Sequence, residues 1–137
     1  MIAVDTNVLA RFYCDDPADP EARRQRPAAR RVVLESTALF VPLTVVLELE
    51  WVMRGFYELA PAPVCEVLEH LLGMAHVTVE RWEAVKDAID LHRAGVDFAD
   101  ALHCTTSSGC EAFVSFDKQL ARFGGKVGAP LPVTLPR

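Results

Sequence analysis

Four carboxylates are placed where an α/β protein can hold a metal ion, although they lie far apart along the chain: Asp5, Glu48, Asp100 and Asp117. Asp5 follows one short apolar segment and Asp117 nearly follows another. Both are therefore expected near the carboxyl ends of strands, where open parallel sheets bind their ligands. Glu48 and Asp100 fall in the first turns of expected helices, which begin at the same edge of the sheet. The sequence predicts that the four acids converge.

Two of these acids lack a basic neighbour at helical spacing. Glu48 has no Lys or Arg three or four residues away, whereas Glu50 has Arg54 at i+4, the spacing of a solvated ion pair. We therefore expect Glu48 to point inward and Glu50 to lie on the surface near Arg54. Asp100 is also unpaired, and Asp97 repels it unless a cation or a proton intervenes. Buried unpaired carboxylates are costly, and their hard oxygen atoms favour magnesium or manganese over zinc.

Each acid also has a purely structural interpretation. Asp5 and Asp97 can cap the helices that follow them, and Asp117 can belong to a turn. Their placement as a set favours a metal cluster. A group of basic residues is a second candidate feature, either a solvated helix face or a clamp for an RNA backbone. It comprises Arg23, Arg24, Arg26, Arg30 and Arg31.

The overall composition limits the class of protein. The net charge is −5, from 14 basic and 19 acidic residues, which disfavours a protein that grips phosphates directly. An enzyme that meets phosphates through metal ions needs such negative charge. The apolar segments are too short to span a bilayer, and the start does not resemble a signal peptide. Four cysteines without a CxxC pair are typical of a reduced, cytoplasmic protein.

Short apolar segments alternate with amphipathic ones along the chain. Strands are expected at residues 2–4, where the strand should be buried, and at 39–42, 77–79 and 112–115. Helices are expected up to residue 12, up to 35 with a start or kink at Pro27, and at 44–57, 63–72, 81–94 and 98–108. The Gly- and Pro-rich tail is expected to be mostly loop, with one edge strand near Val133. This alternation predicts one α/β layered domain over residues 1–137 with a mainly parallel sheet.

Four segments resemble, in order, the motifs of PIN-domain ribonucleases. They are IAVDTNVL at 2–9, LELEWV at 47–52, DFADALH at 97–103 and SFDK at 115–118. The motif acids of that family fall on Asp5, Glu48, Asp100 and Asp117, so none is missing. The small size of the chain is similar to that of the VapC-like toxins of bacterial toxin–antitoxin pairs.

The resemblance implies a three-layer α/β/α fold and a magnesium- or manganese-dependent endoribonuclease. In such a protein the four acids hold one or two cations that activate a water molecule and neutralise charge on the scissile phosphate of the RNA. It also implies a small antitoxin as partner and a homodimer. Thr6, Asn7 and Ser115 are then expected to orient carboxylates or water, with Asp97 at the rim of the site.

Other functions remain open at this point. A phosphoryl-transfer enzyme with Asp5 as nucleophile usually has an acid two residues later, where this chain has Asn7. A receiver-like switch needs a lysine after a late strand, which Lys118 fits only loosely. A PIN-like module that binds RNA without cleaving it is the third alternative. Exposed aromatic residues would anchor either the antitoxin or a second copy of the chain, and the candidates are Trp51, Phe56 and Tyr57.

Overall fold

The computed structural model describes all 137 residues, which form seven helices and five strands. They divide into two compact units, an N-terminal unit (Met1–Glu80) and a C-terminal unit (Arg81–Arg137). All strand pairs in both units are parallel. The protein is thus a helix-rich α/β protein with short parallel strands, which confirms the fold class predicted from the sequence.

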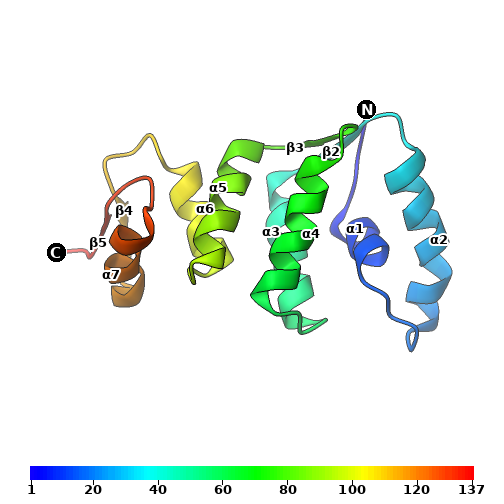
Figure 1. The fold of residues 1–137 in the computed structure, drawn as a ribbon, viewed down its shortest axis with the longest axis horizontal. Coiled ribbons are helices and arrows are strands. Elements are labelled where there is room, and N and C mark those ends of the chain that lie inside the picture. Colours follow the sequence, from blue (N-terminus) through cyan, green and yellow to red (C-terminus); the bar gives the residue numbers. More distant parts are fainter. The chain divides into compact units, whose positions relative to one another are not determined.

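The N-terminal unit contains a three-stranded sheet in the order β1-β2-β3. Ile2 pairs with Leu39 and Leu39 with Val77, so the strands are in register along the middle strand. Parallel neighbours need long crossover connections, and here each crossover consists of two helices (Figure 1). In chain order the elements are β1 (Ile2–Ala3), α1 (Thr6–Tyr13), α2 (Pro20–Glu35), β2 (Leu39–Val41), α3 (Leu43–Gly55), α4 (Pro61–Gly73) and β3 (Val77–Val79).

The core of this unit lies around the middle strand. Leu39 and Val41 of β2 are fully buried, as are Leu49 and Met53 of α3. The first strand differs from the prediction of a buried strand over residues 2–4, because both residues of β1 are exposed and only Val4 is buried. The physical reason is that β1 lies at the edge of the three-stranded sheet rather than in its middle.

The C-terminal unit begins with a helical pair, followed by a small sheet of two parallel strands joined through a helix (Figure 1). Phe98, whose side chain is fully buried, anchors the start of α6. Gly95 in the connection between the paired helices has φ +112°, a conformation that favours glycine. The elements are α5 (Trp82–Arg93), α6 (Phe98–Thr106), β4 (Phe113–Val114), α7 (Lys118–Val127) and β5 (Val133–Thr134).

The prediction of a mostly irregular tail is wrong, because residues 118–127 form α7. Asp117 caps this helix by accepting a hydrogen bond from the backbone N–H of Leu120, at 3.0 Å. Gly124 lies against Val133 of β5, and a Cβ atom added to it would come within 3.2 Å of that side chain. One of the glycines that suggested a loop is therefore the place where the strand packs on the helix.

The structure decides where the second helix begins, which the prediction left open. It begins at Pro20, where Asp19 caps it through the backbone N–H of Glu21, and it passes through Pro27. A proline in the first turn costs no hydrogen bond, so Pro20 is compatible with this start, and of the two predicted alternatives a start at Pro27 is excluded. The buried residues Ala29 and Val33 lie beyond Pro27, and their packing stabilises the helix past the point where proline removes a donor.

Two further expectations concern the whole chain. No helix is both long enough and apolar enough to cross a membrane. The four cysteines are all free, with Cys14, Cys65 and Cys104 buried and Cys110 exposed.

Candidate metal centre

In the N-terminal unit a single threonine connects two of the four predicted acids. Asp5 caps α1, and its Oδ1 atom accepts a hydrogen bond from the backbone N–H of Thr6 at 2.8 Å. The hydroxyl group of Thr6, which is buried, donates a short hydrogen bond to Oε1 of Glu48 on α3. The threonine therefore fixes one oxygen of each carboxylate, and both acids are exposed.

The two glutamates of α3 are placed the opposite way from the prediction. Glu50 is only 1% exposed, and it forms an ion pair with Arg54, with 3.0 Å between Oε2 and Nε. Glu48 is exposed, as is Trp51. The buried face of α3 instead includes Met53 and Glu50. The i,i+4 pairing was correctly identified, but such a pair does not reveal which face of a helix is buried.

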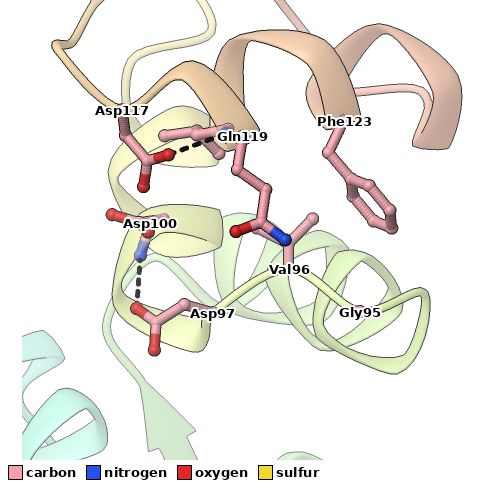
Figure 2. Close-up of a pocket in the computed structure, with 8 residues that line it drawn as sticks. Gly95, Val96, Asp97, Asp100, Asp117, Gln119 and Phe123 are labelled. Carbon is pink, nitrogen blue, oxygen red and sulfur yellow. Dashed lines mark hydrogen bonds between the residues drawn. The ribbon is translucent and has the colours of Figure 1, made fainter.

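In the C-terminal unit three acids line one cavity of about 170 Å³ (Figure 2). Asp97 caps α6 by accepting a hydrogen bond from the backbone N–H of Asp100 at 3.3 Å. Asp117 caps α7, and its own backbone N–H donates to Oγ of Ser115 at 3.0 Å. Figure 2 shows the side chain of Asp100 between those of Asp97 and Asp117. The N-terminal ends of two helices thus bring three carboxylates to one cavity.

The electrostatics of this cavity are unbalanced. Burial raises the pKa of the Asp100 carboxyl, and the negative charges of Asp97 and Asp117 raise it further, while His103 lowers it. No lysine or arginine forms an ion pair with any of the three acids. The partial positive charge of the helix N-termini is the main local compensation.

A divalent cation fits this donor set chemically. The carboxyl oxygens of Asp100 accept no hydrogen bond from the protein, and one oxygen of Asp117 is likewise unused by the cap. Oxygen-only ligands suit magnesium or manganese rather than zinc. A cation among the three acids would also relieve the repulsion that raises the pKa of Asp100.

Each unit contains two of the four predicted acids. No set of three or more acidic, histidine or cysteine side chains is arranged to hold a metal ion. The N-terminal unit places Asp5 beside Glu48 through Thr6, and the C-terminal unit places Asp100 beside Asp117. The convergence of these two pairs stays a prediction.

The remaining predicted residues have varied surroundings. Asn7 is exposed, and its side chain forms no hydrogen bond. Ser115 holds the backbone of Asp117 through its hydroxyl oxygen, as described above. His103 stacks on Phe113, with 6.1 Å between the ring centroids and 15° between the ring planes. Its charge acts on Asp100, but the contact that positions its ring is a packing contact.

The sequence prediction missed two side chains in the wall of the acidic cavity. Gln119 and Phe123 lie on α7, in the segment that was expected to be loop. The signal that could have revealed them is the spacing of Asp117 and Leu120. An acid followed three residues later by a buried leucine is typical of a capped helix start.

A comparison with protein-family models identifies the chain. The model of the PIN domain matches residues 2–126, so the chain belongs to the PIN-domain family. A comparison with curated proteins gave no match. Membership of this family supports a metal-dependent nuclease, a hydrolase that uses divalent ions such as magnesium.

Proposed function

We propose that this protein is a magnesium- or manganese-dependent endoribonuclease and the toxin of a type II toxin–antitoxin pair. The observation that carries the nuclease assignment is the cavity shared by Asp97, Asp100 and Asp117. It gathers three carboxylates without a lysine or arginine partner, and burial together with the charges of Asp97 and Asp117 raises the pKa of Asp100. Together with the match to the PIN domain, this arrangement supports a cation site that serves phosphodiester hydrolysis.

Four acids would hold the cation in this proposal, namely Asp5, Glu48, Asp100 and Asp117. A bound divalent cation supplies charge neutralisation at the scissile phosphate and makes water a nucleophile at neutral pH. The protein's own groups orient the ligands. Thr6 fixes one oxygen of Asp5 and one of Glu48, which leaves the second oxygen of each carboxylate for another partner.

The C-terminal acids are oriented by their helices. The cap of α7 uses Oδ1 of Asp117 and leaves Oδ2 for the cavity, while Ser115 holds the backbone at that point. Asp97 uses one oxygen to cap α6, which fixes the first turn that carries Asp100. Asp97 is therefore proposed as a positioning residue at the rim, as its motif position suggested.

The nuclease assignment is tested by incubating the purified protein with RNA and magnesium, manganese or excess EDTA. We expect cleavage within the RNA with either metal, none with EDTA, and none with Asp100→Asn. The matched control is Asp90→Asn, which removes the same charge from an exposed position of α5 in the same unit. Full cleavage in EDTA, or an active Asp100→Asn protein, would contradict the assignment.

The toxin assignment rests on the motif set of the chain and on its surface. The acid-rich cavity attracts basic side chains as well as cations, and an arginine from a partner can form two hydrogen bonds with one carboxylate. Trp51 and Phe56 are 62% and 68% exposed, and they offer apolar area for an antitoxin or a second copy of the chain. Tyr57, the third candidate anchor, is less exposed, and its hydroxyl accepts a hydrogen bond from Arg11 at 3.0 Å.

A growth experiment tests this part of the proposal. Expression of the wild-type protein in bacteria should arrest growth, and co-expression of the small protein encoded beside it should relieve the arrest. Asp100→Asn should be harmless at the same expression level, which separates toxicity caused by RNA cleavage from the general burden of overexpressing a protein. Normal growth with the wild-type protein, together with no binding to the neighbour-encoded protein, would refute the toxin role and leave the nuclease assignment intact.

A further inference from the structure

A second cavity lies beside the acidic one in the C-terminal unit, and it is basic. Its volume is about 290 Å³, and its lining residues are Gln119, Arg122, Phe123 and Lys126. These four positions follow the i, i+3, i+4, i+7 pattern and so share one face of α7. Gln119 and Phe123 line the acidic cavity as well, so the two cavities share part of their walls, and this face of α7 with both cavities is here called the α7 groove.

The charges along this groove change sign. The acidic end contains Asp100 and Asp117, and the other end contains Arg122 and Lys126, which are exposed and form no ion pair. The helix itself has three basic residues and no acidic one, in a chain whose net charge is −5. A concentration of unpaired cations beside an anionic centre is suited to a polyanion that must reach that centre.

Between the two ends the groove presents an aromatic ring. Phe123 is partly exposed, and its ring rests on Gly95, where an added Cβ atom would lie 3.2 Å from Cζ. Because Gly95 has no side chain, the ring of Phe123 can lie close to its backbone. The positive φ of Gly95 also disfavours any other residue at this position. Figure 2 shows the ring on the same side of α7 as the amide of Gln119. The ring is therefore held in place from one side, and its exposed part faces the groove.

We propose that the α7 groove binds the single-stranded part of the RNA that adjoins the scissile phosphate. Arg122 and Lys126 contact successive phosphates, and Phe123 stacks on one base. This inference rests on the proposed nuclease function and adds the surface of α7 that holds the RNA beside the acidic cavity. A base in a duplex has both faces covered by its neighbours, so stacking on a protein ring requires an unpaired strand.

Binding can be measured separately from cleavage. The probe is a short fluorescein-labelled single-stranded RNA of mixed sequence. Its binding to the protein is measured by fluorescence anisotropy in excess EDTA, and the same sequence is then measured as a duplex. We expect tighter binding of the single strand. Phe123→Leu should weaken single-strand binding by about fivefold or more, the lower end of the range for loss of one stacked base. Circular dichroism checks that each variant is folded.

The basic residues are tested through salt dependence. Arg122→Gln and Lys126→Gln should each weaken binding and each lower the slope of log K against log salt by about 0.7, the value for one phosphate contact on a single strand. The matched control is Lys86→Gln, an exposed lysine of α5 that lines neither cavity. It should leave the slope and the affinity close to wild type.

The outcomes separate this inference from the nuclease assignment. If the wild-type protein binds duplex as tightly as single strand, or if the α7 variants match Lys86→Gln, the groove is not the RNA path, even where metal-dependent cleavage is present. If the α7 variants lose binding while no cleavage occurs under any metal condition, the groove is confirmed and the nuclease assignment fails.

Discussion

The buried glutamate of α3 gives a sharp test of the packing of the N-terminal unit. The side chain of Glu50 is 1% exposed, and it forms an ion pair with Arg54, whose side chain is 45% exposed. The distance between Nε of Arg54 and Oε2 of Glu50 is 3.0 Å. Replacing Arg54 with Met keeps most of the aliphatic stem but leaves a buried carboxylate without this partner. Removing one member of a buried ion pair costs about 3–5 kcal/mol. Because water screens the exposed arginine, we expect about 2–3 kcal/mol here.

The measurement is urea unfolding of wild type and variant, followed by circular dichroism. The expected loss corresponds to a fall in Tm on the order of 5–10 °C for a chain of this size. The matched control is Arg26→Met, the same substitution in an ion pair with Asp15 at 2.6 Å whose side chains are 30% and 66% exposed. That pair is near the surface, so its loss should cost about 0–1 kcal/mol.

A double-mutant cycle isolates the pair from any other contact of Arg54. Glu50→Gln removes the buried charge and keeps an oxygen that can still accept from the arginine, so it should cost less than Arg54→Met. In the double variant no buried charge is left, and the second substitution should cost less than it does alone. The reasoning is refuted if Arg54→Met costs no more than Arg26→Met, or if the two substitutions are additive.

Three further predictions concern the C-terminal unit and its ligands. Gly95→Ala should destabilise the protein by about 1–3 kcal/mol, because the new methyl group meets the ring of Phe123 and the positive φ is strained; unchanged urea unfolding would contradict this. Without metal, Asp100→Asn should be more stable than wild type at neutral pH. The pKa of this carboxyl is higher in the folded state than in the unfolded chain, so its ionisation lowers the stability of the wild type as pH rises through that pKa. The advantage of Asn should therefore vanish in acid. A variant that is less stable than wild type at neutral pH would count against repulsion among the three acids. Magnesium at ~100 times its dissociation constant should add about 2.7 kcal/mol of stability to wild type, and no shift in Tm at millimolar magnesium would count against the site.

The sequence predicted the element order well wherever the apolar period was clear. The strands at 39–41 and 77–79 and the helices of the C-terminal pair begin within a residue or two of their predicted positions. Local capping signals also placed Asp5 and Asp97 at helix starts, where the structure has them. These features depend on residues close together in the chain, which is why a single sequence contains them.

Two failures involve contacts between distant residues. The buried face of α3 is set by what packs on it, so the i,i+4 partner of Glu50 could not show that this acid is buried. The helix over 118–127 contains two glycines, and one of them is explained only by Val133 of β5. The groove residues on α7 were missed because the local capping signal of Asp117 and Leu120 was overlooked, and a segment expected to be loop has no predicted face.

We propose that Asp5, Glu48, Asp100 and Asp117 all serve the bound cation, and manganese binding tests this proposal most directly. Titration of the metal-free protein with Mn²⁺, followed by electron paramagnetic resonance of the free ion, counts the bound metal. The account predicts that Asp5→Asn in the N-terminal unit and Asp100→Asn in the C-terminal unit each abolish or strongly weaken the same site, while Asp90→Asn binds as wild type does. Wild-type affinity and stoichiometry in either Asp5→Asn or Asp100→Asn would contradict it.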